Sequence, residues 1–400
     1  MVLLYIRWNI NDYRAYLYSS SANLTGLEKA IKLQPLNAVY QRFLGEYLWY
    51  RHDWQGAIKQ YKTAIKLDPL EPRLWLDLAA AYQFTGDHKT EAKALETAVR
   101  LDPTNPATAL EAANFYLVAG DVDSAVREFH IILDQSNDPE QVRLAFDRSW
   151  KATGDIDKLL AELVPATASA HLTLLDMLVA RKEAGPAERV WSHLVSLHVP
   201  FDRKPAFGYF DYLIETKQVE QAQLVWSDLV ARDSLKAYCS TGNLVVNGGF
   251  EEDLLNGGFD WRYRPLPDVI AEIDTTESHA GHRALLASFD GPPVAEIGVS
   301  QLIPVQPNTE YRFSAYMKTE DIEGGSGPRF VIEDAYTHER YLVSTDRVGS
   351  SLWAEEAADF TTGTSTTLVL LRIMRLPGDE PIRGKMWFDD VSLAARDRNF

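Results

Sequence analysis

The chain has 400 residues, of which 46% are hydrophobic and 24% charged, so it is long enough for two or three domains with a sizeable core. Its net charge of -17 is concentrated in the second half: residues 242–400 carry 26 acidic and 14 basic side chains, whereas residues 1–241 carry 31 and 26. This acidity argues against nucleic acid and anionic lipid as partners, because both bind to basic surfaces.

The single cysteine and the first residues set further limits. Cys239 alone cannot form an internal disulfide or a cysteine zinc site. No stretch approaches the roughly 20 apolar residues of a membrane helix, so we expect no membrane span in this chain. The apolar start, Met1–Trp8, is too short for a signal peptide and lacks a small-residue cleavage site. It fits either the first half-helix of a domain or the remnant of a longer N-terminal segment.

A Leu-X-Pro triplet recurs with a spacing of 34 residues, at Leu33–Pro35, Leu67–Pro69 and Leu101–Pro103. Between the triplets, small residues stand where two helices of a hairpin would approach closely, and large ones where neighbouring hairpins would pack. Gly86 and Gly120 stand where a first helix would end and turn. The small residues are Ala57, Ala64, Ala98 and Ala125, and the large ones are Tyr61, Trp75, Tyr82 and Phe129.

This period and these positions resemble the tetratricopeptide repeat family. The best repeats cover residues 38–137, and degenerate ones continue over 139–232, with helix pairs expected near 139–164, 167–198 and 204–232. The resemblance implies one all-α superhelix over residues 1–235 and a protein or peptide partner in its groove. Some relatives clamp a C-terminal carboxylate with basic and amide side chains on the first helices. The polar first-helix positions here are mostly acidic, which argues against such a clamp: Arg42, Glu46, Asp77, Glu111 and Asn114.

From residue 243 the hydrophobic period changes from 3.6 to 2, which indicates β-strands. In Tyr311–Met317, apolar residues alternate with polar ones, and turn signals such as Gly324–Pro328 and Leu376–Asp379 separate such segments. Further strands are expected at 299–305, 329–333, 341–343, 366–374 and 385–393. About eight or nine short strands favour a two-sheet sandwich or jelly roll over residues 243–395, after a linker at 236–242. The segment Asn243–Asp253 reads as the first strand and a turn, in which the glycines supply backbone freedom and Phe250 enters the core.

Four segments occur in an order that is similar to carbohydrate-binding modules of the family 4/9/22 kind, which have a galactose-binding-like jelly-roll fold: 243–251, 278–286, 299–318 and 387–393. The resemblance implies a structural calcium ion near the first and last strands. Its side-chain candidates are Glu251 and Asp390, with Asp389 and Glu252 as second choices, because calcium takes several hard oxygen ligands. The alternative is a turn cap by Glu251 and a hydrogen-bonded or solvated pair of aspartates.

A sugar site needs an aromatic platform flanked by planar polar groups. Tyr316 is the best candidate, because it shares the polar face of its strand with Arg312. Trp261, Tyr341 and Trp353 are further candidates, with edge or core packing as the alternative for each. Trp387 is expected in the core.

No catalytic motif is recognisable. Glycine-rich phosphate loops, a Gly-x-Ser-x-Gly elbow and a His-Glu-x-x-His pair are absent, and no cofactor other than calcium is indicated. His279 and His282 flank a turn, where a solvated turn is expected and a metal pair is the alternative. The sequence therefore favours a non-catalytic scaffold that binds a protein and a polysaccharide in a bacterial periplasm, cell envelope or exterior. The alternatives are a purely structural assembly protein, or an accessory subunit of a carbohydrate-active enzyme.

Overall fold

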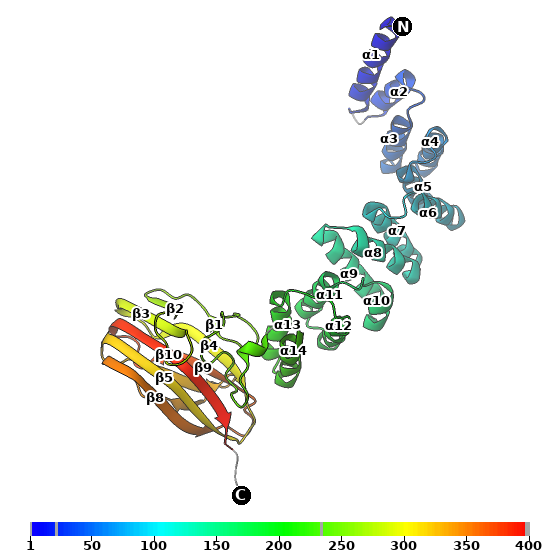
Figure 1. Cartoon of the computed structure of the whole chain (residues 1–400). Coiled ribbons are helices and arrows are strands. Elements are labelled where there is room, and N and C mark those ends of the chain that lie inside the picture. The colour runs from blue at the N-terminus through cyan, green and yellow to red at the C-terminus, as the bar shows by residue number, and fades with distance from the viewer. Residues whose placement is uncertain (1, 21–22, 233–234, 397–400) are drawn as a thin grey trace. The chain divides into compact units, whose positions relative to one another are not determined.

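The computed structural model describes residues 2–20, 23–232 and 235–396. The chain forms two compact units, residues 1–200 and residues 201–400. Helices precede two antiparallel β-sheets in chain order (Figure 1), which confirms the predicted fold class.

The first unit is built from helical hairpins. Its helices are α1 (Val2–Ser19), α2 (Leu24–Leu33), α3 (Ala38–Tyr50), α4 (Trp54–Leu67), α5 (Pro72–Thr85), α6 (His88–Leu101), α7 (Pro106–Ala119), α8 (Val122–Gln135), α9 (Pro139–Thr153), α10 (Ile156–Glu162), α11 (Ala168–Ala180) and α12 (Ala184–Ser196). The predicted glycines end the first helices: Gly86 and Gly120 are the C-caps of α5 and α7, in the left-handed conformation.

A periodically repeated aspartate marks the start of the second helix of each hairpin. An aspartate side chain accepts a backbone N–H at the start of each of α4, α6, α8 and α10 and satisfies a donor that the helix leaves free. These aspartates are Asp53, Asp87, Asp121 and Asp155, again 34 residues apart. The hairpins close tightly where small residues were expected: Ala57, Ala64 and Ala98 are fully buried, and a Cβ on Gly45 would lie 2.6 Å from the Tyr61 ring.

The second unit contains one more helical hairpin, α13 (Lys204–Glu215) and α14 (Val219–Arg232), a 3₁₀ helix (Leu235–Tyr238) and ten strands among its described residues. The strands are β1 (Arg262–Tyr263), β2 (Val269–Asp274), β3 (Ala284–Pro293), β4 (Glu296–Pro304), β5 (Glu310–Glu323), β6 (Pro328–Asp334), β7 (Arg340–Val343), β8 (Gly349–Thr361), β9 (Leu368–Arg375) and β10 (Pro381–Ala395). Sheet A has the order β1-β4-β9-β6-β7, and sheet B the order β2-β3-β10-β5-β8.

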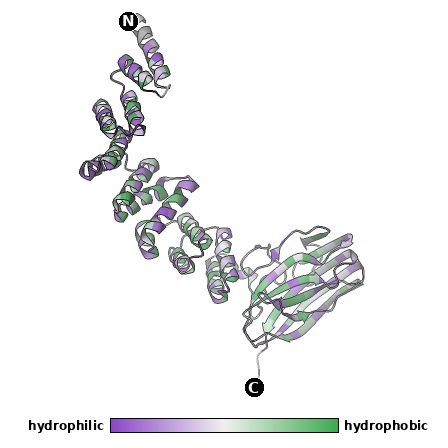
Figure 2. Cartoon of the chain, turned by 180° about the vertical axis from the view of Figure 1, so that it is seen from behind, coloured by the Kyte–Doolittle hydropathy of each residue, from purple (hydrophilic) through white to green (hydrophobic). Residues whose placement is uncertain are grey.

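The hydrophobic core of this unit lies between the two sheets. Along β5, Tyr311, Phe313, Ala315 and Met317 point into the core, and the residues between them are more exposed. This is the alternation that a sheet with one buried face requires. Both hydrophobic and hydrophilic residues occur along the strands in the hydropathy colouring (Figure 2).

The hairpin α13–α14 packs against the sandwich rather than only continuing the repeats. A Cβ on Gly257 would lie 2.2 Å from the Phe207 ring, and one on Gly258 would lie 2.2 Å from Trp226, so these positions admit no side chain. Phe259 contacts Trp226 edge to face. The compact unit that contains the sandwich therefore begins at residue 201, whereas the sequence placed the last hairpin with the solenoid and expected a linker at 236–242.

Residues 243–250 open the sandwich. The sequence predicted a first strand and a turn here, but the segment forms a turn without a strand, held by backbone hydrogen bonds. Leu244 N–H donates to Leu393 O of β10 across 2.8 Å, and Asn247 N–H donates to Tyr238 O across 2.7 Å. Phe250 is fully buried in the core, as predicted. Glycine is required at position 248 for a reason other than the predicted backbone freedom. A Cβ on Gly248 would lie 2.1 Å from Val391 O, so the close approach to β10 excludes a side chain.

Candidate functional site

The outer face of sheet B carries an aromatic cluster. Because Ala315 and Met317 of β5 point into the core, Tyr316 between them lies on the opposite face. Trp353 of β8 and Trp387 of β10 lie on the same face, where they pack with Ala284 and Leu286 in a cluster separate from the core. We call Tyr316, Trp353, Trp387 and His279, which comes from the loop after β2, the aromatic face.

His279 covers the ring of Tyr316. The two rings are nearly parallel, with an interplanar angle of 11° and centroids 3.5 Å apart. The ring of Trp353 stands at 60° to His279, with centroids 5.9 Å apart, so the rings form a corner. The side chain of His279 is 30% exposed. The sequence pattern around His279 indicates only a solvated turn, so this stacking on Tyr316 was not predicted.

Two neighbouring aspartates of β10 hold His279 in place. Asp390 Oδ2 lies 2.5 Å from His279 Nδ1, and Asp389 Oδ2 accepts the backbone N–H groups of His279 and Ala280 across 2.8 and 3.1 Å. Asp390 has a positive φ of 47°, at an irregularity in the pairing of β10 with β5. Burial raises the pKa of Asp389 to about 6, although the N–H donors of the loop and of Asp390 act in the opposite direction.

Charged side chains flank the aromatic face. Lys318 Nζ lies 5.1 Å from the centroid of the Trp387 ring and 2.7 Å from Glu277 Oε2. Trp387 Nε1 donates to Asp274 Oδ2 across 2.7 Å. Trp387 is buried, as predicted, but on the outer face of sheet B and not in the core between the sheets.

The other predicted sugar-binding residues lie in different places. Arg312 shares the outer face of sheet B with Tyr316, and its Nη1 donates to Asp359 across 3.2 Å. Trp261 is fully buried, where it stacks on Phe250 and its Nε1 donates to Asn247 O, so the prediction of a surface platform is wrong for this residue. Tyr341 packs against the core and stacks on Phe360, so it does not belong to the aromatic face.

Three of the four predicted calcium ligands, Glu251, Asp389 and Asp390, act as hydrogen-bond acceptors for the turn at residues 279–283. Glu251 Oε1 accepts the backbone N–H groups of His282 and Arg283 across 2.8 and 3.1 Å. Gly281 makes this possible, since a Cβ there would lie 2.1 Å from the same oxygen. The backbone of Glu252 exchanges two hydrogen bonds with the Asn247 side chain.

A calcium ion needs oxygens that are free to point at it. In this arrangement, Glu251 and Asp389 point at N–H donors, and Asp390 points at His279. Within the part of the chain that the structure describes, no group of three or more His, Cys, Asp and Glu side chains could hold a metal ion. The residues therefore do not fit a calcium site as they stand, and calcium remains a prediction from the sequence resemblance.

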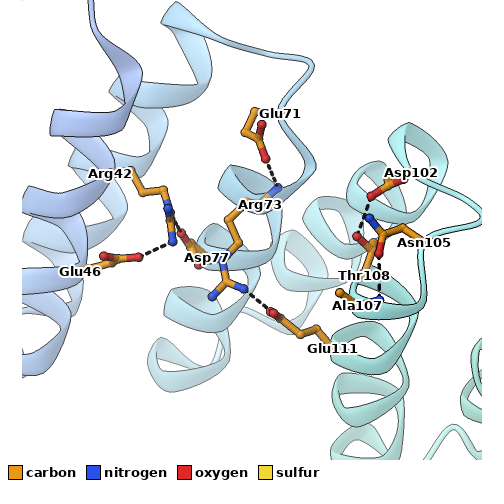
Figure 3. A network of polar contacts seen from close by, with 10 residues as sticks. All are labelled: Arg42, Glu46, Glu71, Arg73, Asp77, Asp102, Asn105, Ala107, Thr108 and Glu111. Carbon is orange, nitrogen blue, oxygen red and sulfur yellow. Dashed lines mark hydrogen bonds and ion pairs between the residues drawn. The ribbon is translucent and has the colours of Figure 1, made fainter. Parts of the chain in front are cut away.

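In the first unit, the polar first-helix positions form a ladder of ion pairs across successive repeats (Figure 3). Arg42 Nε donates to Asp77 Oδ2 across 2.7 Å and so joins α3 to α5. Arg73 binds Asp77 on its own helix and Glu111 on α7. The acidic side chains at the first-helix positions, which were predicted to disfavour binding of a carboxylate, are thus paired with arginines. A hydrogen bond between Arg148 and Asn114 joins α9 to α7, and an ion pair between Asp147 of α9 and Arg181, the residue that follows α11, continues the series.

A cavity of about 640 Å³ lies at the start of this ladder, between α1, α2 and α3. Tyr16 and Tyr50 on its rim are 61% and 75% exposed, which is unusual for large aromatic side chains. Glu46, which is bound to Arg42, is the one charged residue of its lining in the described part of the chain.

Among the described residues, no helix has both the length and the hydrophobicity needed to cross a membrane.

Comparison with known proteins supports both resemblances. Residues 44–106 match a family model described as tetratricopeptide repeat, and residues 242–375 match one described as carbohydrate binding domain. The comparison with curated proteins gives no match.

Solved structures also resemble each part of the chain. One titled "CBM4 structure and function" is 15% identical, with a TM-score of 0.30, and the match covers 38% of this chain and 99% of that one. The CBM22-1 xylan-binding domain from Paenibacillus barcinonensis Xyn10C is 18% identical, with a TM-score of 0.28 and coverage of 37% and 91%. The first TPR of Spaghetti (RPAP3) bound to an HSP90 peptide is also 18% identical, with a TM-score of 0.26 and coverage of 30% and 94%.

The family models and the fold agree with the sequence patterns: residues 44–106 match a tetratricopeptide repeat within the helical part, and residues 242–375 match a carbohydrate binding domain within the β-sandwich.

Proposed function

We propose that this protein is a non-catalytic scaffold that binds a glycan on the aromatic face of its sandwich and a protein through its helical repeats. The observation that carries the glycan part is the corner formed by Trp353 and His279 on an open sheet face. A flat ring can stack on the C–H face of a pyranose, and flanking polar groups can bind its hydroxyls.

A glycan array with the full chain tests the glycan part. We expect retention of at least one polysaccharide by the wild type, and a loss of about tenfold or more in affinity for Trp353→Ala and for Tyr316→Ala. Tyr341→Ala is the matched control, since Tyr341 packs against the core of the same domain away from this face. If the wild type retains no glycan, the proposal fails and the sandwich is better regarded as a protein-contact domain.

The protein partner is proposed on the family match and on the cavity between α1, α2 and α3. Helical repeats bury each hairpin against its neighbours and leave an extended face for a partner. The exposed rings of Tyr16 and Tyr50 give that face an apolar anchor point, of the kind that carries binding energy at protein interfaces. A pull-down from the organism's own extract, wild type against Tyr16→Ala with Tyr50→Ala, tests this part: a partner lost only with the variant supports it.

The cellular setting is also part of the proposal. A repeat domain joined to a glycan-binding domain suits assembly or export of a polysaccharide at the bacterial cell envelope. The calcium ion that the sequence resemblance implies at Glu251 and Asp390 is not part of this proposal, because these carboxylates point at backbone N–H donors and at His279. The runner-up functions are a purely structural protein that binds no sugar and an accessory subunit of a carbohydrate-active enzyme.

A further inference from the structure

We propose that the helical repeats bind a partner-protein segment that carries basic side chains beside apolar ones, and that the basic side chains enter two cavities at equivalent places in the repeats. This inference rests on the proposed protein-binding function of the repeats and names the chemical class of the partner.

Large apolar side chains are exposed at one repeated position of the first unit. They lie near the C-terminal ends of α1, α3, α5 and α7, with a spacing of 34 residues, and they are Tyr16 (61% exposed), Tyr50 (75%), Phe84 (56%) and Val118 (73%). A single exposed apolar residue is ordinary, whereas a row of them at a repeated position indicates an interaction surface. We call these four residues the apolar row.

Ring contacts connect the apolar row across neighbouring repeats. Trp49 meets Tyr50 edge to face, with ring centroids 5.2 Å apart, and it meets Phe84 in the same way at 5.6 Å. Trp54 stacks on Phe84 with centroids 4.7 Å apart and an interplanar angle of 11°. The apolar surface therefore extends from α3 and α4 to α5, which suits a protein segment rather than a small molecule enclosed in one cavity.

The apolar row borders two cavities at equivalent places. The cavity of about 640 Å³ described above is lined by Tyr47 and Tyr50 of α3 and by part of α2, and a second cavity of about 430 Å³ is lined by Phe115 and Val118 of α7 and by part of α6. Tyr47 and Phe115 are separated by two 34-residue periods, and so are Tyr50 and Val118. The same groove between one hairpin and the next is thus hollow at two places.

The carboxylates that line these cavities indicate the charge of the partner. In the described part of the chain, Glu46 lines the first cavity, Glu91 and Asp121 line the second, and neither is lined by a lysine or an arginine. His88, which also lines the second cavity, already lies 2.9 Å from Glu91 Oε2 through Nδ1. Aromatic rings beside carboxylates attract cations, because the face of the ring carries partial negative charge.

The ion-pair ladder beside the first cavity leaves a negative charge in excess. From α3 to α7 it contains three carboxylates and two guanidinium groups, those of Glu46, Asp77, Glu111, Arg42 and Arg73 (Figure 3). Arg42 is shared between Glu46 and Asp77, and Glu46 uses only Oε1 in its contact. Burial raises the pKa of Glu46, and this effect exceeds the opposing effect of Arg42. A basic side chain of the partner would supply the missing positive charge.

Selection of random dodecapeptides, displayed on phage, against the immobilised full chain tests the proposal. We expect the retained peptides to contain lysine or arginine beside an aromatic or aliphatic residue more often than the starting library does. A fluorescein-labelled copy of the most enriched peptide then gives the affinity of each variant by fluorescence polarisation.

Two substitutions at one exposed position separate charge from shape. Val118→Lys places a positive charge at the second cavity and should weaken binding of that peptide about tenfold, whereas Val118→Glu should bind it at least as tightly as the wild type does. Glu46→Gln and Tyr50→Ser should each weaken binding about tenfold as well. Glu140→Gln is the matched control, because Glu140 is exposed on α9 and lines neither cavity. Far-UV circular dichroism of each variant shows whether its helices are retained.

The outcomes distinguish this inference from the proposed function. If the wild type retains no peptide, both the protein-binding function and the partner class are wrong. If the retained peptides are acidic or uncharged and Tyr50→Ser releases them, protein binding stands and the partner class is wrong. If Val118→Lys and Val118→Glu bind the peptide alike, the argument from charge is wrong.

Two other occupants would also overturn the inference. If choline binds more tightly than every selected peptide, the first cavity is a site for a small organic cation. If light scattering shows a dimer of the wild type that Val118→Lys converts to a monomer, the apolar row contacts a second copy of this chain.

Discussion

Arg42 reaches across one repeat to Asp77, 35 residues away, and its Nε donates to Asp77 Oδ2 over 2.7 Å. Asp77 also accepts from Arg73 on its own helix, and its side chain is only 8% exposed. One nearly buried carboxylate therefore holds two helices of successive hairpins.

Asp77→Asn should destabilise the helical repeats by about 1–3 kcal/mol, because it leaves two guanidinium groups without their common anion. Urea unfolding of the full chain, followed by far-UV circular dichroism, measures this change. Asp157→Asn is the control: its pair with Arg189 is exposed on both sides, at 64% and 62%, and should contribute about 0–1 kcal/mol. If the two variants lose the same free energy of unfolding, the Asp77 ion pairs stabilise the protein no more than an exposed ion pair does.

The stability of the repeats should depend on pH through His171. This fully buried histidine lies 2.8 Å from Thr167 O through Nδ1 and 2.8 Å from His193 Nδ1 through Nε2. Burial, with a smaller contribution from His193, lowers its pKa below the usual value, although the bond to Thr167 acts in the opposite direction. The unfolded chain therefore binds the proton more readily than the folded one.

This contribution to stability is present above the unfolded pKa of about 6.5 and is lost as the pH falls through the lower, folded value. His171→Phe should remove that part of the pH dependence, and His198→Asn, at an exposed position, should not. Unfolding midpoints of both variants between pH 5 and 8 measure the effect. A His171→Phe profile parallel to that of the wild type would contradict the assignment.

Asp260 should give the sandwich unit a pH dependence of the opposite sign. It is fully buried, Oδ2 accepts Leu255 N–H across 2.7 Å, and Oδ1 has no partner among the described residues. Burial raises its pKa to about 7. The folded unit therefore keeps a proton that the unfolded chain releases near pH 4.

Stability should thus fall as the pH rises from about 4 to about 7, by up to roughly 4 kcal/mol, and level off above that. Asp260→Asn should flatten this profile, whereas the exposed Asp268→Asn should leave it unchanged. Urea unfolding followed by tryptophan fluorescence at pH 4.5 and 8 compares them. The idea fails if Asp260→Asn keeps the wild-type difference between the two pH values.

Glu251→Gln separates turn capping from calcium binding. The loss of the charged acceptor for His282 and Arg283 N–H should lower the stability of the sandwich by about 1 kcal/mol. Since the carboxylates are occupied by N–H donors, we expect melting curves of the wild type with calcium and with chelator to coincide. A midpoint that rises with calcium concentration in the wild type, and not in Glu251→Gln, would instead establish the calcium site.

The sequence by itself determined the local structure of this protein: its helices, the ends of those helices and the inward face of its strands. The 34-residue period located the hairpins, and the glycines at 86 and 120 end helices as expected, because the hydrogen bonds that form and end a helix join residues only a few positions apart. The alternation along Tyr311–Met317 likewise assigned the inward residues of β5. The aspartate caps could also have been predicted, since Asp53 and its equivalents share the same period.

Only the tertiary structure decided which distant groups meet. Trp261 and Trp353 are both aromatic residues of the sandwich, yet one is fully buried on Phe250 and the other lies on an outer face. His279 reaches Tyr316 because Asp389 and Asp390, more than a hundred residues later, hold its loop. Such pairings depend on how strands and loops pack across the sheet, and a pattern of neighbouring residues carries no information about that packing.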